Sequence, residues 1–199
     1  IFQLGGEAPA TTFAGAAGFG HWSTEAYVDN LKVVSFADGS VLYENTFDDA
    51  SSLDDLKHDL ATYSGGTYTG DPAVFEWEDG TLHQTDSSST GVISYFGDTT
   101  WRNYIYSMDV MPVAGAEGAT ILGAINLDAP SYVLYNCGGW SNTKGCWQTY
   151  NAGTTESFDG DGLDKSLAYD EWHTLQLVVL DYAIFSYIFN VYTAAQKQF

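Results

Sequence analysis

The amino-acid sequence predicts an all-β fold, an antiparallel β-sandwich of the jelly-roll type with at most one short helix. Aromatic residues make up 16% of the 199 residues, and there are 21 glycines but only 4 prolines. This mixture is typical of strands joined by tight turns. Roughly ten runs of β-branched and aromatic residues follow one another at short intervals, with turn signals between them. Only one segment has helical spacing.

The chain is expected to divide into a flexible apolar arm over residues 1–19 and one β-sandwich domain over residues 20–199. The arm begins with Ile-Phe-Gln-Leu and continues with glycine and alanine, with a single charge at Glu7. Such a composition favours a flexible segment. The remaining length is sufficient for one domain with a substantial core.

A hairpin and a helix are predicted next. Residues 22–34 end in clear alternation, and the pair Asp38-Gly39 supplies a turn to a second strand over residues 41–47. Residues 51–61 then carry leucines at helical spacing, with serine available as an N-cap. We expect one to three helical turns there.

The rest of the chain is predicted to be strands. The pair Asp79-Gly80 is a strong signal for a type I′ hairpin between residues 75–77 and 82–84. The later strands are expected over residues 92–96, 101–113, 119–127, 132–136, 146–148, 172–179 and 183–192.

Charge excludes two classes of partner. The chain has 26 acidic and 6 basic residues, for a formal net charge of −20. Nucleic acids and anionic membranes are bound through lysine and arginine, so neither is expected as a partner. Residues 177–195 have the length of a transmembrane helix, but they contain Asp181 and Asn190. Two buried strands joined at residues 180–182 explain this segment better, and no membrane span is predicted.

Both cysteines lie in residues 132–148, YVLYNCGGWSNTKGCWQ. Cys137 and Cys146 flank the break that Gly138-Gly139 makes between two expected strands. A disulfide between them would close a short loop and contribute about 2–3 kcal/mol. Two buried thiols are the alternative.

The segment YVLYNCGGWSNT resembles the strand-GGWxNT-strand signature of the concanavalin-A-like, laminin-G-like β-sandwich found in and beside α-L-arabinofuranosidases. Further segments resemble this family in the same order, over roughly residues 41–192: VLYENTFDD, VFEWEDGTLHQ, TTWRNYIYSMDV, GAEGATILGAI and YDEWHTLQLVV. The resemblance implies glycan recognition. Aromatic rings that stack on sugars, with polar side chains for the hydroxyl groups, could be supplied by Trp140, Asn142, Trp147, Gln148 and Tyr150. Core packing is the alternative for Trp140.

The order of the segments departs from the family pattern. GHWSTEAYVDNLKV, at residues 20–33, resembles the family's final strand but comes first. Residues 20–34 either close their own sandwich or are donated to a neighbouring copy. Donation would give a homo-oligomer or a polymer, and the expected contact residues are Ile1, Phe2, Leu4, Trp22, Tyr27, Val28, Leu31 and Val33.

The sequence therefore leads to three hypotheses about function. The first is an extracellular, non-catalytic subunit that forms a homopolymeric fibre by strand donation and could associate with glycans. The alternative is a carbohydrate-binding module of a plant-polysaccharide-active enzyme. A glycoside hydrolase is the weakest, because no Glu-x-Asp-x-x-Glu run is present. Glu76 and Glu78 share a strand face, but a solvated edge explains them as well.

Calcium is the one cofactor that the sequence suggests. Asp159, Asp161 and Asp164 place three carboxylates in a glycine-rich segment, and oxygen ligands of this kind suit Ca²⁺. An acidic surface turn is the alternative. Asp29-Asn30, with Glu44 and Asp48, would be a second cluster if the N-terminal strand lies beside the strand at residues 41–47.

Overall fold

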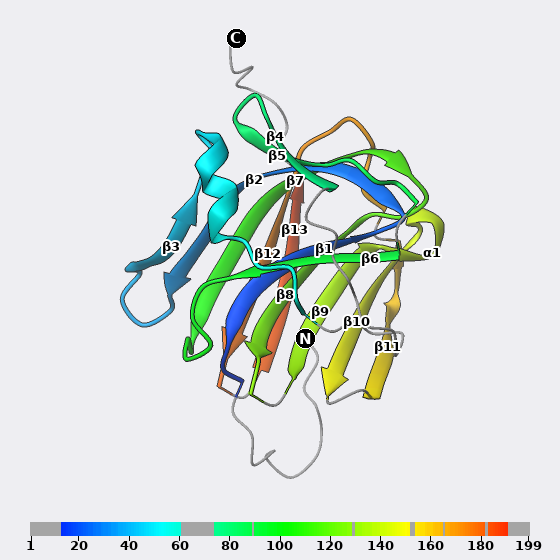
Figure 1. Cartoon of the computed structure of the whole chain (residues 1–199). Coiled ribbons are helices and arrows are strands. Elements are labelled where there is room, and N and C mark those ends of the chain that lie inside the picture. The colour runs from blue at the N-terminus through cyan, green and yellow to red at the C-terminus, as the bar shows by residue number, and fades with distance from the viewer. Residues whose placement is uncertain are drawn as a thin grey trace.

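The structure, a computed structural model, shows two antiparallel sheets packed face to face (Figure 1). It describes residues 13–60, 74–88, 90–128, 130–151, 154–164, 166–181 and 183–190. The antiparallel β-sandwich predicted from the sequence is thereby confirmed. Apart from two short helical segments, the regular structure of the described residues consists of strands.

The first sheet has six strands in the order β11-β10-β9-β8-β1-β6. Neighbouring strands far apart in sequence, such as β1 and β8, are paired antiparallel throughout. The strands of this sheet are β1 (Ala16–Trp22), β6 (Thr90–Phe96), β8 (Ala119–Asn126), β9 (Ser131–Gly138), β10 (Lys144–Asn151) and β11 (Thr154–Asp164).

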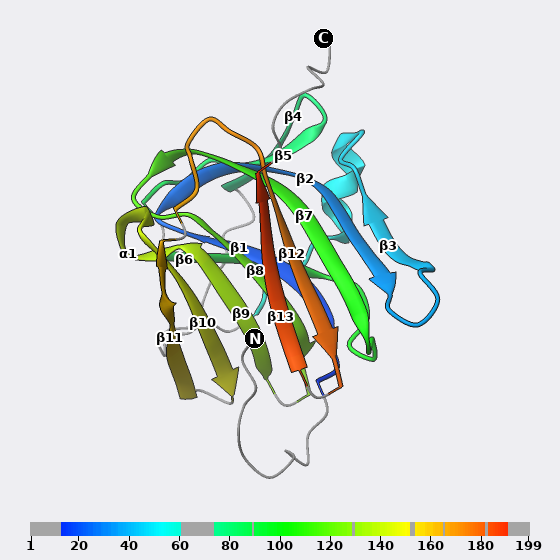
Figure 2. The same ribbon diagram turned by 180° about the vertical axis from the view of Figure 1, so that it is seen from behind.

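The second sheet has seven strands, six of them in the order β13-β12-β7-β2-β5-β4, while β3 pairs with β2 (Figure 2). The strands are β2 (Thr24–Ser35), β3 (Val41–Asn45), β4 (Phe75–Glu78), β5 (Thr81–Gln84), β7 (Tyr104–Gly115), β12 (His173–Leu180) and β13 (Ala183–Asn190). β12 and β13 form a hairpin that includes most of the apolar segment at residues 177–195. Among the described residues, none of the helices has the length and apolar character needed to cross a membrane.

The N-terminal strands are interior strands, one in each sheet. β1 pairs with β6 and β8, and β2 pairs with β7, β5 and β3. Residues 20–34 therefore close their own sandwich in this structure. β1 begins at Ala16, inside the segment for which the composition predicts a flexible arm. Phe19 is fully buried there, and a Cβ atom on Gly18 would come within 2.5 Å of the Ser94 carbonyl oxygen, so glycine permits the close approach of β6.

The described side chains that were expected to mediate assembly make contacts within their own chain or line a pocket. Val28, Leu31 and Val33 are fully buried in the core of their own chain. The ring of Tyr27 stacks on His83 at 4.1 Å. Ile1, Phe2 and Leu4 lie outside the described residues, and Trp22 lies at the site described below. The described residues thus give no support to a fibre formed by strand donation.

Alternation along each strand divides the apolar residues between two clusters. One, the inter-sheet core, fills the space between the sheets and includes Phe19, Val28 and Tyr106. Burial of each such side chain contributes about 1.5–3 kcal/mol. The other, the outer-face cluster, lies on the opposite face of the six-stranded sheet and includes Leu122 and Leu134. Both faces of this sheet are therefore partly apolar.

A buried tyrosine ties the two sheets together. The hydroxyl of Tyr104, on β7, donates to the Ala16 carbonyl at 3.3 Å and accepts from the Ala124 N–H at 2.9 Å. Because the side chain is fully buried, these bonds satisfy a hydroxyl that would otherwise be costly to bury.

The predicted helix is shorter than its spacing indicates. A 3-10 helix, η1 (Ala50–Asp55), is capped by Asp49, whose carboxylate accepts from the Ser51 N–H at 2.8 Å. The chain then becomes extended, because Lys57 exchanges two backbone hydrogen bonds of 2.9 Å with Tyr95 at the edge of β6. Leu56 and Leu60 both lie in this extended segment. Leu56 packs in the inter-sheet core and Leu60 in the outer-face cluster.

The disulfide prediction is wrong, and the strand register explains why. Cys137 is opposite Gly145, and Cys146 is opposite Asn136. Successive side chains of a strand point to opposite faces, so this register sends the two sulfur atoms to different sides of the sheet. Cys137 lies in the inter-sheet core, and both cysteines are buried thiols.

Candidate functional site

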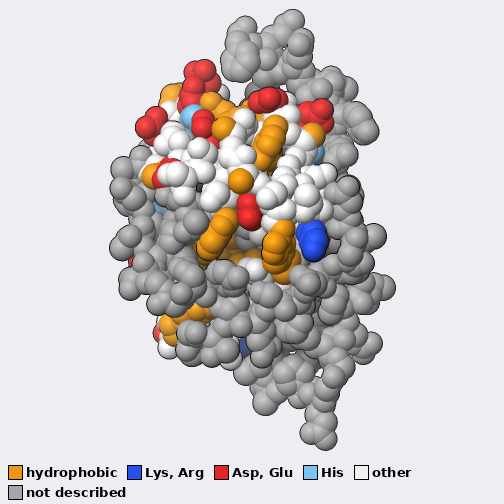
Figure 3. Space-filling model, turned by 90° about the vertical axis from the view of Figure 1, so that its right-hand side faces the viewer, with side chains coloured by type: hydrophobic (Ala, Val, Ile, Leu, Met, Phe, Trp, Pro, Cys, Tyr) orange, Lys and Arg blue, Asp and Glu red, His pale blue; other side chains and the backbone are white. Residues whose placement is uncertain are grey.

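A pocket of about 220 Å³ lies on the outer face of the six-stranded sheet, beside the turn between β9 and β10. Five strands and two connections contribute to it, which explains why it is not visible as a local sequence motif. Its lining comprises Gly20, His21, Trp22, Ile93, Glu117, Thr120, Leu134, Asn136, Trp140 and Gln148. Figure 3 views the molecule from the side that carries α1 and β11 in Figure 1, and shows hydrophobic side chains spaced among acidic and uncharged polar ones.

Strand register brings the lining residues together. Asn136, Thr120, Gly20 and Ile93 lie opposite one another across four adjacent strands. Residues that face each other in this way have Cβ atoms about 4.5–5.5 Å apart. Because Gly20 has no side chain, the surface of the sheet is lower at Gly20 than at its neighbours Thr120 and Ile93. Gly20 therefore forms the floor of the pocket.

A left-handed turn forms one wall of the pocket. In the short segment α1 (Gly139–Asn142), the φ angles of Trp140, Ser141 and Asn142 are 51°, 62° and 57°. This conformation costs about 1–2 kcal/mol for each residue that is not glycine, so the surroundings must hold it. The Asn142 amide donates to the Leu167 carbonyl at 2.6 Å and accepts from the Leu167 N–H at 2.9 Å. The turn presents the Trp140 ring, which is 45% exposed.

The carboxylate of Glu117 lies in the lining of the pocket, near Asn136 and Trp140. Burial raises the pKa of the Glu117 carboxyl, and the Asn136 amide and the backbone N–H groups of Ser141 and Trp140 lower it in part. The backbone of Glu117 is fixed, since its N–H donates to the Thr24 hydroxyl and its carbonyl accepts from the same hydroxyl at 2.6 Å.

His21, on β1, is one of the lining residues, but its ring lies on the face of the sheet that faces the inter-sheet core. The ring lies edge-on to Phe19, with the ring centres 6.3 Å apart. Neither ring nitrogen has a hydrogen-bond partner in the described part of the chain. Burial lowers the pKa of His21 to about 4, so the imidazole is neutral at physiological pH.

The structure places Trp140 and Gln148 at the pocket, as two of the five residues suggested for glycan binding. Tyr150 lies on the same face of the sheet, where its ring stacks on Tyr132 at 5.0 Å within the outer-face cluster. It therefore supports the sheet beside the pocket.

The other two suggested residues have structural contacts. Asn142 is engaged with Leu167, as described above. Trp147 points to the opposite face of β10, where its ring lies 5.0 Å from Tyr135 and packs against the inter-sheet core.

Sequence reasoning missed Glu117, Thr120 and Asn136, and it assigned Trp22 to assembly. Asn136 lies inside the signature segment, and alternation with Leu134 could have placed both on one face. Glu117 gives no such signal, because it reaches the pocket from the connection between β7 and β8.

The first calcium prediction remains a prediction. Asp159, Asp161 and Asp164 lie on β11, and their side chains are outside what the structure describes. Among the residues that are described, no group of three or more His, Cys, Asp or Glu side chains is arranged to hold a metal ion.

The second acidic cluster does not fit a calcium site. Glu44 is bonded to the Lys32 ammonium at 2.6 Å, so its charge is already neutralised. The Asn30 amide donates to Asp109 at 2.8 Å, and Asp48 accepts from Thr46 at 2.6 Å. These oxygens are engaged by donors of the protein itself.

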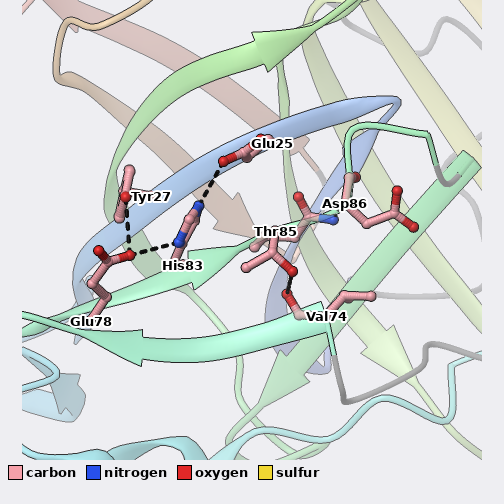
Figure 4. Close-up of polar contacts among 8 residues, drawn as sticks. Glu25, Tyr27, Val74, Glu78, His83, Thr85 and Asp86 are labelled. Atoms are coloured by element: carbon pink, nitrogen blue, oxygen red, sulfur yellow. Dashed lines mark hydrogen bonds and ion pairs between the residues drawn. The ribbon is translucent and has the colours of Figure 1, made fainter.

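The pair Glu76 and Glu78 lies on the edge strand β4, away from the pocket. The Glu78 carboxylate contacts His83 Nδ1 at 2.7 Å and accepts from the Tyr27 hydroxyl at 3.1 Å (Figure 4). The other ring nitrogen of His83 contacts Glu25 at 3.0 Å. This network ties the β4–β5 hairpin to β2, and Glu78 is part of that tie.

Sequence comparison finds similarity to part of a longer protein. A protein of Streptomyces chartreusis described as an extracellular exo-alpha-L-arabinofuranosidase is 29% identical over 130 residues. The match covers 65% of this chain but 14% of that protein. No protein-family model matches the chain, and no solved structure matches it. The similarity and the two packed sheets fit a β-sandwich domain that resembles those in arabinofuranosidases.

Proposed function

We propose that this chain is a non-catalytic carbohydrate-binding module, of the concanavalin-A-like type, within a secreted protein that acts on plant polysaccharides. Its ligand would be a neutral polysaccharide that bears α-L-arabinofuranosyl groups. The pocket beside α1 carries this proposal, because it combines aromatic rings with polar side chains in one place. The similarity to an extracellular arabinofuranosidase supports the choice of sugar.

The pocket contains the groups that a sugar needs. The apolar face of a sugar ring can stack on the exposed ring of Trp140, and Trp22 supplies a second aromatic wall. The Thr120 hydroxyl and the Gln148 amide have no hydrogen-bond partner among the described residues. Each is therefore available to a sugar hydroxyl.

The size and charge of the pocket limit the kinds of sugar that it can bind. Its volume of about 220 Å³ is below the range of about 300–1,000 Å³ that is typical for drug-sized ligands, so it suits one terminal sugar residue. Glu117 places a carboxylate in the lining, and the chain carries a net charge of −20. Both disfavour uronic acids, because like charges repel.

Binding to arabinoxylan, measured by isothermal titration calorimetry, tests the proposal. We expect Trp140→Ala to weaken binding about tenfold, because it removes the stacking surface. Phe36→Ala is the matched control, since Phe36 is an exposed aromatic (53%) in the turn after β2 and should bind as the wild type does. Polygalacturonate, an acidic polysaccharide, should give no heat of binding. Failure of the wild type to bind arabinoxylan, or equal binding by Trp140→Ala, would contradict the proposal.

A further inference from the structure

We propose that Thr120 and Gln148 determine the specificity of the sugar site by holding one sugar residue from two sides. Each side chain forms a hydrogen bond with a different hydroxyl group of that sugar, so both hydroxyl groups are required for binding. This inference rests on the proposed function, although one of its tests does not require a ligand.

The polar groups of Thr120 and Gln148 are buried without a partner in the protein. Thr120 is 8% exposed and Gln148 is 9% exposed, and both line the pocket. Among the described residues, neither the hydroxyl of Thr120 nor the amide of Gln148 has a hydrogen-bond partner. Burial of an unpaired polar group lowers stability, and buried polar groups are nearly always paired for this reason. Two exceptions in one pocket indicate that a ligand supplies the missing partners.

Packing alone does not explain a polar side chain at position 148. Gln148 lies opposite Leu134 on β9, and its neighbours on the same face of β10 are Cys146 and Tyr150. All three neighbours are buried, and Leu134 and Tyr150 belong to the outer-face cluster. An apolar side chain at this position would extend that cluster. The amide of Gln148 therefore has no role in the packing of the sheet.

Thr120 reaches the pocket from the other side of β9. It lies opposite Asn136, and Gln148 lies opposite Leu134, two residues away along the same strand. The other strand beside Thr120 presents Gly20, which has no side chain. Because one strand separates β8 from β10, their backbones lie about 9–10 Å apart. A single sugar ring over β9 can therefore meet Thr120 on one side and Gln148 on the other.

The chemistry of the two side chains matches that of a neutral sugar. The Thr120 hydroxyl both donates and accepts, and the Gln148 amide has an N–H₂ donor and a carbonyl acceptor. A sugar hydroxyl also donates and accepts, so it can pair with either side chain. When the ligand lacks one of the two hydroxyl groups, the side chain opposite it stays unpaired. This cost is what allows a site that binds a hydroxyl group to discriminate against an analogue without it.

The first experiment measures arabinoxylan binding by isothermal titration calorimetry. Thr120→Val and Gln148→Met keep the approximate size of each side chain but remove its hydrogen-bonding groups, so each should weaken binding about tenfold. Thr120→Ser keeps the hydroxyl and should bind within about threefold of the wild type. Thr174→Val makes the same chemical change on the other sheet and should bind as the wild type does. Wild-type affinity in Thr120→Val or in Gln148→Met would overturn the proposal.

The second experiment tests whether both side chains contact the same sugar residue. Methyl α-L-arabinofuranoside contains one sugar residue and should bind the wild type in an NMR titration. Thr120→Val and Gln148→Met should each weaken its binding about tenfold, as they weaken the binding of arabinoxylan. Its fully O-acetylated form has no free hydroxyl group and should not bind. A variant that weakens the binding of arabinoxylan but not of the glycoside would contradict a single sugar held from two sides, as would binding of the acetylated form.

The third experiment needs no ligand and uses differential scanning calorimetry. The hydroxyl of Thr174 donates to the Asp109 carboxylate at 2.6 Å, so Thr174→Val should lower the Tm by about 2–4 °C. The hydroxyl of Thr120 has no such bond to lose, and Thr120→Val should unfold at the Tm of the wild type or above it. A lower Tm for Thr120→Val would overturn the proposal. The expected Tm values, without binding of arabinoxylan to the wild type, would reject the proposed ligand and leave the unpaired polar groups for another ligand with hydroxyl groups.

Discussion

The imidazole of His21 is enclosed on the core side of β1 and has no polar partner among the described residues. Burying a polar group without a hydrogen bond lowers stability, and burying it charged would lower stability much further. The side chain therefore remains neutral, with its pKa lowered from 6.5 to about 4. Its contribution to stability depends on pH for this reason.

Acidification should destabilise the chain through His21. Between pH 6.5 and about pH 4 the unfolded chain binds a proton at this residue and the folded chain does not, so the free energy of unfolding falls as the pH falls. The loss should reach roughly 3 kcal/mol by about pH 4. His21→Phe should remove this part of the pH dependence, measured by urea unfolding at several pH values. Equal losses in both proteins would contradict the assignment of a buried neutral His21.

At the scale of secondary-structure elements, the sequence predicts an element correctly where that element depends only on neighbouring residues. Asp79-Gly80 predicts a type I′ hairpin, and both residues have positive φ angles between β4 and β5. The helix predicted within residues 51–61 ends early, at Asp55, because the chain after it pairs with a distant strand. Lys57 pairs with Tyr95, and that pairing extends the chain after η1. A sequence pattern does not reveal which strand edge will be available.

The two cysteines illustrate the same limit. The sequence predicts that they flank the connection between two neighbouring strands, but a register of one residue decides whether their side chains share a face. We expect two thiols to react with Ellman's reagent after unfolding without a reductant. Dithiothreitol should leave the unfolding midpoint unchanged, whereas reduction of a disulfide would cost about 2–3 kcal/mol. A lower unfolding midpoint in the presence of dithiothreitol would show that the assignment of two thiols is wrong.

The candidate site was predictable only in part. Trp140 and Gln148 lie in or beside the signature segment, so the sequence indicates both as candidate site residues. Trp22 and Glu117 reach the pocket from β1 and from the connection after β7, and long-range pairing decides their position. The face of the sheet that each side chain occupies depends on that pairing.

For the whole molecule, composition sets the electrostatic background. A net charge of −20 on 199 residues makes the folded chain repel itself. Sodium chloride at about 0.5 M shortens the range of this repulsion to a few ångströms, so stability should rise by on the order of 1 kcal/mol, or about 2–4 °C in Tm. Differential scanning calorimetry at low and high salt measures this shift. A Tm that falls on addition of salt would mean that attractive ion pairs, such as Lys32 with Glu44, dominate instead.

The pairing of β1 and β2 with distant strands affects how the chain folds. β1 pairs with β8 and β2 pairs with β7, so residues 16–35 find their main partners among residues 104–126. During synthesis the pairing of β1 with β8 and of β2 with β7 cannot form until residues 104–126 have emerged. Contacts over such sequence distances slow folding, because a long loop must close before any pairing stabilises it. Both sheets are therefore expected to form together and late, in one cooperative step that requires the first strands and the middle of the chain at the same time.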